Sequence, residues 1–222
     1  MSSCAGCPYV ERFCTNPNGS GADDCPTINN KKDNDVAKLK YSDENFEKFF
    51  KESIRQEGSG YAYDKEGDAY ACKTRLQEII EFSRRMNYKK LGLAFCMGLA
   101  NEASILNKIL IANGFEVVSV ICKVGSIRKE EFNITKDEKV NPEKYEPICN
   151  PIAQAEICNN EHTEFNIVLG LCVGHDSMFF KNSDAMCTVF AVKDRVLAHN
   201  PIGALYTSNS YYKWLKKPLD NH

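Results

Sequence analysis

Continuous apolar runs that stop at a cysteine recur along the chain. LGLAFC ends at Cys96, FEVVSVIC ends at Cys122 and NIVLGLC ends at Cys172. A buried strand of a parallel sheet is a nearly unbroken Val, Ile and Leu run, so each of these runs predicts such a strand. AMCTVFAV predicts a fourth strand, with Cys187 at its beginning.

Helical patterns fill the segments between these runs. MGLANEASILNKILIANG predicts a helix that stops at Gly114, and GHDSMFFKN predicts a short one. Asn150 and Pro151 are the expected N-cap and first residue of a helix over IAQAEICNN. Because strand–helix–strand crossovers are right-handed, we predict an α/β fold, with a small parallel, Rossmann-like sheet flanked by helices. The turn after Cys96 lacks G-x-G-x-x-G, so no dinucleotide site is expected.

Amphipathic helices are expected before the sheet. Ser42 is the predicted N-cap of a helix that ends near Gly58, and residues 68–87 have helical spacing with Cys72 in the apolar stripe. Cys72 is expected in the core, because free cysteine behaves as a small hydrophobe. A further helix is predicted at SNSYYKWLKKP, near the end of the chain.

The first 30 residues follow neither pattern. Their four cysteines lie among Gly, Pro, Asn, Asp and Ser, and are Cys4, Cys7, Cys14 and Cys25. Since so few apolar positions cannot build a core, and small cysteine modules fold around tetrahedral zinc or an iron–sulfur cluster, we predict a metal-binding module. The module and its linker are assigned to residues 1–41, and the α/β domain to residues 42–222. Disulfides or reduced thiols are the alternative for the four cysteines.

Composition narrows the possible partners. The net charge of the 222 residues is -2, with acids and bases interleaved, which predicts no nucleic-acid or anionic membrane partner. No apolar run is long enough to span a bilayer, and the N-terminus lacks a signal-peptide pattern, so a cytoplasmic protein is expected. In a reducing compartment, 11 cysteines indicate metal ligation or redox chemistry before disulfides.

The chemistry is expected at the carboxyl edge of the sheet, where open α/β sheets bind ligands. Cys96, Cys122 and Cys172 end strands there, and Cys149 precedes a helix N-terminus that favours its thiolate. Ligands so far apart in sequence suit an iron–sulfur cluster, of the 4Fe–4S type, better than a structural zinc site. If only three cysteines bind iron, one metal position is open to substrate.

The other cysteines and the polar residues near this edge of the sheet have different expected roles. Cys158 and Cys187 are expected to pack in the interior. The candidate proton or substrate handlers at the edge are His175, Asp176, Lys193 and Asp194.

Four segments of the chain resemble an uncharacterised metal-binding family of anaerobic bacteria and archaea, domain of unknown function 1847. They are CAGCPYVERFC, RLQEIIEFSRRMNYKKLGLAFCMGLANEA, CNPIAQAEICNN and LGLCVGHDSMFFKNS with VFAVKDRVLAHNPIGALY. The resemblance covers nearly the whole chain. It implies cysteine-bound metal and an anaerobic cytoplasm, where oxygen-sensitive clusters survive, and it names no reaction or substrate.

Three functions are compatible with the sequence. The first is a metalloprotein with an N-terminal metal and an iron–sulfur site that does redox, Lewis-acid or sulfur-handling chemistry. The second is a non-enzymatic protein that binds or delivers a metal such as zinc. The third is a thiol enzyme in which Cys96 or Cys149 is the nucleophile and only the N-terminal site holds metal.

Overall fold

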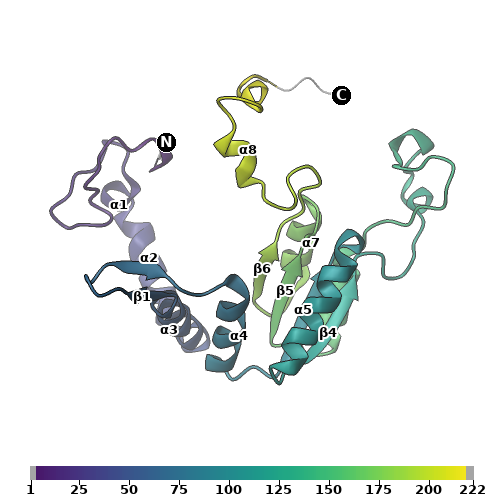
Figure 1. Cartoon of the computed structure of the whole chain (residues 1–222), viewed down its shortest axis with the longest axis horizontal. Coiled ribbons are helices and arrows are strands. Elements are labelled where there is room, and N and C mark those ends of the chain that lie inside the picture. The colour runs from purple at the N-terminus through teal and green to yellow at the C-terminus, as the bar shows by residue number, and fades with distance from the viewer. Residues whose placement is uncertain (1–3, 219–222) are drawn as a thin grey trace. The chain divides into compact units, whose positions relative to one another are not determined.

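The computed structural model describes residues 4–218, which divide after Ala71 into two compact units. The first unit begins with a 3-10 turn, η1 (Cys4–Gly6), and continues through three helices and a hairpin (Figure 1). These elements are α1 (Pro26–Asn29), α2 (Lys31–Tyr41), α3 (Glu44–Ser59), and the antiparallel strands β1 (Tyr61–Tyr63) and β2 (Ala69–Ala71). The separate module predicted for residues 1–41 stays a prediction.

The start of α3 differs from the expected one. Ser42 was predicted to cap this helix, but it ends α2, which occupies the segment expected to be a linker. Ser42 Oγ donates to the carbonyl oxygen of Lys38 at 3.3 Å, whereas the Asp43 carboxylate accepts from the backbone N–H of Asn45 at 2.9 Å. Asp43 is therefore the N-cap, since its side chain satisfies a first-turn N–H.

The helix predicted from residue 68 begins later. Its first residues form β2, and α4 (Arg75–Arg85) starts after the N-cap Thr74, which forms a capping box with Gln77. Cys72 lies between the strand and the helix and is exposed, so its expected place in the core was wrong. The helical spacing of apolar residues begins in β2 and continues through Thr74 into α4. Periodicity alone therefore cannot show where the strand ends and the helix begins.

The second unit is built on a parallel sheet of four strands in the order β4-β3-β5-β6 (Figure 1). The strands are β3 (Lys90–Phe95), β4 (Glu116–Ile121), β5 (Phe165–Leu169) and β6 (Cys187–Ala191). They are connected in turn by α5 (Ala100–Ala112), α6 (Pro151–Asn160) and α7 (His175–Asn182). The α/β fold with a parallel sheet flanked by helices is confirmed.

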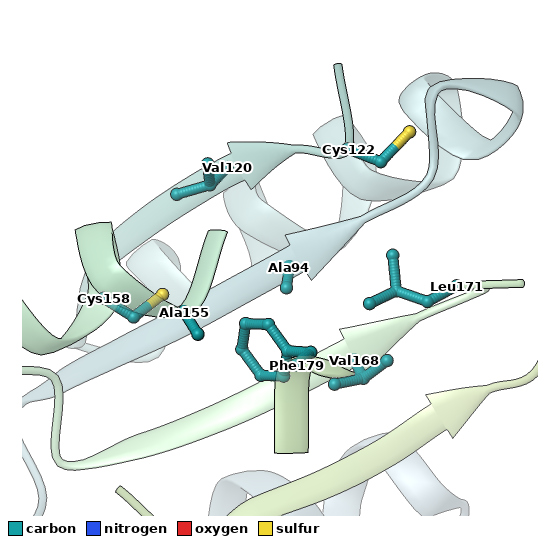
Figure 2. Packing of buried hydrophobic residues seen from close by; sticks show 8 residues of the cluster. All are labelled: Ala94, Val120, Cys122, Ala155, Cys158, Val168, Leu171 and Phe179. Carbon is teal, nitrogen blue, oxygen red and sulfur yellow. The ribbon is translucent and has the colours of Figure 1, made fainter. Parts of the chain in front are cut away.

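The core on the α6 and α7 side of the sheet follows the alternation of strand side chains. Ala94, Val120 and Val168 lie on this face and pack in one cluster with Cys158 and Phe179 from the two helices (Figure 2). Cys158 is fully buried, as expected. Because side chains on one face recur every second residue, the residues two positions after Ala94 and Val120 share this face. These residues are Cys96 and Cys122.

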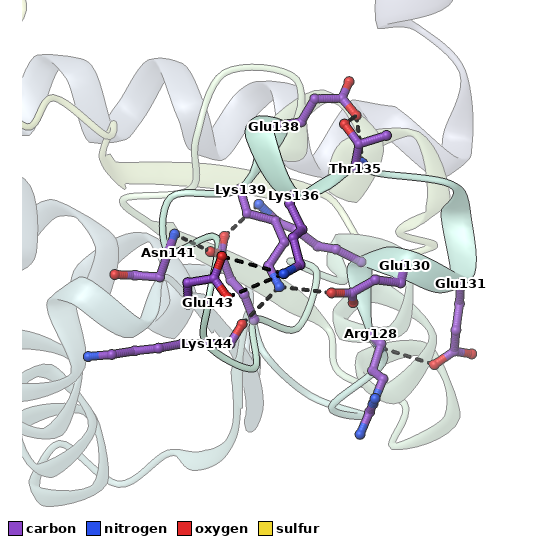
Figure 3. A network of polar contacts seen from close by, with 12 residues as sticks. Arg128, Glu130, Glu131, Thr135, Lys136, Glu138, Lys139, Asn141, Glu143 and Lys144 are labelled. Atoms are coloured by element: carbon purple, nitrogen blue, oxygen red, sulfur yellow. Dashed lines mark hydrogen bonds and ion pairs between the residues drawn. The ribbon is translucent and has the colours of Figure 1, made fainter.

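Residues 125–148 form a polar excursion with two short 3-10 turns, η3 (Lys129–Phe132) and η4 (Lys136–Glu138). Ion pairs hold its turns together: the Nζ of Lys139 lies 2.8 Å from a carboxylate oxygen of Glu130 (Figure 3). The side chain of Lys139 is only 4% exposed. The excursion is therefore ordered mainly by polar contacts.

The end of the described chain contains a short helix, α8 (Ile202–Tyr206), and a 3-10 turn, η5 (Lys213–Lys216). The helix predicted at SNSYYKWLKKP is reduced to η5. Ser210 explains part of this difference, because its hydroxyl donates to the carbonyl oxygen of Thr207 at 3.2 Å and offers the backbone an alternative to a helix. Within residues 4–218, no helix is long and apolar enough to cross a bilayer.

Candidate functional site

The register of the sheet brings Cys96 and Cys122 together. Phe95 pairs with Ile121, so the two cysteines are the next residues on adjacent strands. The backbone N–H of Cys122 donates to the carbonyl oxygen of Phe95 at 2.8 Å, which continues the ladder past the last paired residues. The two side chains consequently lie side by side on the α6 face.

Cys149 reaches the same place from the start of α6. The backbone N–H of Asn150 donates to the carbonyl oxygen of Cys122 at 2.7 Å. The side chain of Asn150 accepts from the N–H of Ala153 at 3.1 Å, which makes it the N-cap, and Pro151 is the first helical residue, as predicted. The cap thus fixes Cys149 beside the end of β4.

Cys96, Cys122 and Cys149 form a hydrogen-bonded group, the thiol trio. The hydrogen bond with Cys122 lowers the pKa of Cys96 to about 4, with smaller contributions from the backbone of Gly98 and from Lys193. The same thiol lowers the pKa of Cys149 to about 5. The pKa of Cys122 is raised, first by its hydrogen bond with Cys149 and then by that with Cys96. The three thiols therefore ionise as one coupled group, in which the thiolate is favoured at Cys96 and Cys149 over Cys122.

Cys172 has a different hydrogen-bond partner from the trio. The sequence predicted that its strand ends on Cys172, but β5 ends at Leu169, and Gly170 turns the chain with a φ of +67°. The sulfur of Cys172 accepts a hydrogen bond from Nη2 of Arg195 at 3.1 Å. The structure therefore groups three of the four predicted edge cysteines and gives the fourth an arginine partner.

Of the four polar residues predicted at this edge, two lie at the thiol trio and two do not. Lys193 hydrogen-bonds to Cys96, and His175 at the start of α7 lies close enough to Cys149 to act on it electrostatically. Asp176 accepts from the backbone N–H of Ser177 at 2.8 Å, and Asp194 accepts from two N–H groups in the turn that follows it. Lys193 and His175 are thus placed at the trio, whereas the two aspartates order local turns.

Two residues near the trio were missed by the sequence analysis. Lys123 lowers the pKa of Cys149 through its charge and a hydrogen bond, and its Nζ donates to the carbonyl oxygen of Pro147 at 2.6 Å. The sequence signal that could have identified Lys123 is its position directly after Cys122, at the end of a predicted strand. The buried side chain of Gln154 donates to the carbonyl oxygens of Val120 and Phe95 at 2.7 and 3.2 Å. Gln154 thus links α6 to the ends of β3 and β4, next to Cys96 and Cys122.

Cys158 and Cys187 have the structural role expected of them. Both pack in the core of the α6 and α7 face, and burial raises the pKa of Cys158 to about 11. Burial also raises the pKa of Cys187, whose sulfur donates to the carbonyl oxygen of Ala185 at 3.4 Å. Protonated thiols in an apolar setting contrast with the ionised pair at the sheet edge.

The four cysteines near the N-terminus line one pocket of the first unit, together with residues that include Arg12, Phe13 and Asp24. The turn η1 brings the C-x2-C pair together, because the N–H of Cys7 donates to the carbonyl oxygen of Cys4 at 3.2 Å. Four thiols on one pocket fit the donor set of a tetrahedral zinc or cluster site.

No ready-made site of three or more histidine, cysteine, aspartate or glutamate side chains for a metal ion is found in the described range 4–218. In the trio, the sulfurs hydrogen-bond with one another. Three soft sulfur donors, two of them ionised, nevertheless have the chemistry that iron–sulfur clusters require of their ligands.

Comparison with known proteins identifies a matching family and a similar protein. A family model described as "Protein of unknown function (DUF1847)" matches residues 25–190. An uncharacterized protein of Methanocaldococcus jannaschii is 56% identical over 155 residues, which cover 70% of this chain and 76% of that protein. No solved structure matches the chain.

Proposed function

We propose that this chain, which belongs to the DUF1847 family, is a metalloprotein whose thiol trio binds an iron–sulfur cluster. Three cysteines would hold a 4Fe–4S cluster and leave one iron open. An open iron supplies a Lewis acid to a bound substrate. In this proposal the α/β domain does chemistry, and the first unit holds a second metal.

The observation that carries the proposal is the convergence of three thiols from three separate segments. Bare thiolates that face each other repel, and here one shared proton and nearby cations offset that repulsion. Such an arrangement is costly unless the thiolates serve a ligand or a reaction. Cluster ligands must be thiolates, so the lowered pKa values of Cys96 and Cys149 favour binding.

The residues around the trio have distinct roles in this proposal. Cys122 would have to lose its proton on binding, because the thiolate is the ligand. Lys193 and Lys123 lie at the two outer thiols and would balance the added negative charge. His175 begins α7 and lies close enough to Cys149 to act on it electrostatically.

The first unit would bind zinc or an iron–sulfur cluster through Cys4, Cys7, Cys14 and Cys25. This assignment is supported by their shared pocket and by the paucity of buried residues around them. Small segments that lack a core fold on a structural metal.

The lowered pKa values also favour a second candidate, a thiol enzyme. A thiolate at Cys96 or Cys149, with its pKa near 4 or 5, is a ready nucleophile at neutral pH. In that case only the first unit holds metal, and the trio stays metal-free.

Metal analysis of anaerobically purified protein separates the two candidates. Iron, zinc and acid-labile sulfide are measured together with the visible absorption spectrum. The cluster proposal predicts iron and sulfide in similar amounts, and predicts that Cys122→Ser loses the part held by the α/β domain. Cys72→Ser is the matched control, because this exposed cysteine lies between β2 and α4 and is not a member of the trio. A colourless protein with zinc and no sulfide would contradict the cluster and favour the thiol enzyme.

A further inference from the structure

Three cationic side chains lie at the carboxyl edge of the sheet, and we call them the cationic rim: Lys193 at Cys96, Lys123 at Cys149 and Arg195 at Cys172. We infer that this rim selects a small anionic substrate and holds it at the trio. The inference rests on the proposed function in one respect, since it takes the trio to be the reactive centre. The charges of the rim themselves do not depend on any metal.

Two lysines of the rim contact the two outer cysteines of the trio. Lys193 hydrogen-bonds to Cys96, and a side chain added at Gly98 would place its Cβ 3.3 Å from Nζ of Lys193. Lys123 hydrogen-bonds to Cys149 at the opposite end. These contacts put one ammonium group on each outer thiol.

Arg195 extends the rim along the start of α7. Its guanidinium donates to the sulfur of Cys172, whose carbonyl oxygen accepts from the N–H of His175 at 3.0 Å. Arg195 follows Lys193 by two residues, on the segment that leaves β6. The arginine therefore adds a planar donor group, which suits recognition of carboxylate-like or tetrahedral anions.

The positive charge of the rim is not cancelled by carboxylates. Across residues 4–218, none of the three cations forms a salt bridge. Asp194, which lies between Lys193 and Arg195 in the sequence, and Asp176 accept hydrogen bonds from backbone N–H groups of their own turns. The three cations are therefore available to attract an anion.

The helices of the sheet add to this potential. α6 and α7 both begin at the carboxyl edge, because each follows a parallel strand, and a helix N-terminus carries about half a positive charge. The site is open to small solutes, since Cys96, Cys149 and Cys172 are each partly exposed. An anion can therefore reach the rim without unfolding the edge.

Calorimetric titration with inorganic anions tests the inference. Sulfate and thiosulfate are the charged probes, and dimethyl sulfone is a neutral molecule of similar shape. Wild-type protein should bind the anions and not the sulfone, with affinity that falls as salt rises. Sulfate and thiosulfate should both bind, since each presents a tetrahedral oxyanion to the rim.

Variants locate the binding site. Lys193→Gln and Arg195→Gln should each weaken anion binding about tenfold, since each removes a charge-assisted hydrogen bond. Lys181→Gln is the matched control, because Lys181 lies in the last turn of α7, at the end away from His175. Unchanged thermal unfolding of each variant shows that the fold is kept.

The outcomes separate this inference from the proposed function. Protein that contains iron and sulfide but binds neither anion overturns the rim and leaves the cluster standing. Metal-free protein that binds anions in a rim-dependent way supports the rim and removes the cluster. Anion binding that Lys193→Gln and Arg195→Gln leave unchanged overturns the inference.

Discussion

Cys122 is the residue that links the thiol trio, since it hydrogen-bonds to both Cys96 and Cys149. Its own pKa is raised because its proton is shared by two thiolates, and theirs are lowered for the same reason. The three titrations belong to the group as a whole. A change at Cys122 should therefore be felt at both of its neighbours.

Alkylation of metal-free, reduced protein tests this coupling. Cys96 and Cys149 have lowered pKa values of about 4 and 5, so their reactivity is present above those values and is lost only as the pH falls through them. Their rates with iodoacetamide should be nearly constant above roughly pH 6, whereas glutathione still gains reactivity up to about pH 9. The rates are measured by peptide mass spectrometry.

The Cys122→Ala variant provides the comparison. Loss of the shared proton should move both rate profiles toward that of glutathione. Profiles in the wild type that already match glutathione would contradict the coupling.

The element that positions Cys149 is α6, and its start was predictable in detail. Asn150 followed by Pro151 is a strong N-cap signal, and both residues have the predicted roles. The apolar runs predicted strands that end at Cys96 and Cys122, one residue past the observed ends at Phe95 and Ile121. Parallel pairing then places the two cysteines side by side.

Other features of the elements could not be predicted from the pattern. The apolar run through Cys172 continues past the end of β5, because Gly170 turns the chain while the apolar pattern persists. α2 has no buried residue, so its sequence lacks the apolar stripe that marks a helix. Lys123 and Arg195 acquire their roles through contacts that only the folded chain defines.

Removal of the α6 cap should have two effects. Asn150→Ala should lower the free energy of unfolding by about 1 kcal/mol, the usual cost of losing an N-cap. It should also raise the pKa of Cys149, because the loosened first turn holds the thiol less firmly beside Cys122. Denaturant unfolding measures the first effect and the alkylation profile the second. Asn160→Ala, at the exposed end of the same helix, should show neither.

The turn at Gly170 can be tested in the same way. Gly170→Ala should destabilise the fold by more than about 1 kcal/mol, since alanine is strained at a positive φ. A Cβ there would also lie 2.0 Å from Cδ1 of Leu99. Gly58→Ala is the control, because that Cβ meets open space within a helix and should stabilise by up to about 1 kcal/mol. Equal unfolding midpoints for the two variants would contradict the strained turn.

At the scale of the whole molecule, each compact unit has its own set of cysteines. The first contains the four that line one pocket, and the second contains the trio at the edge of its sheet. Because the sets lie in different units, we expect substitutions in one to leave the metal of the other in place. The two proposed metal sites therefore differ in construction.

The most direct test of the central claim compares Cys96→Ser, Cys149→Ser and Cys172→Ser, purified without oxygen beside the wild type. Iron and acid-labile sulfide per chain are measured for each. Cys96→Ser and Cys149→Ser should lose the cluster of the α/β domain. Cys172→Ser should keep it, because the sulfur of Cys172 is hydrogen-bonded to Arg195 and does not belong to the trio. Full iron and sulfide in the first two variants, or loss in Cys172→Ser alone, would contradict the account.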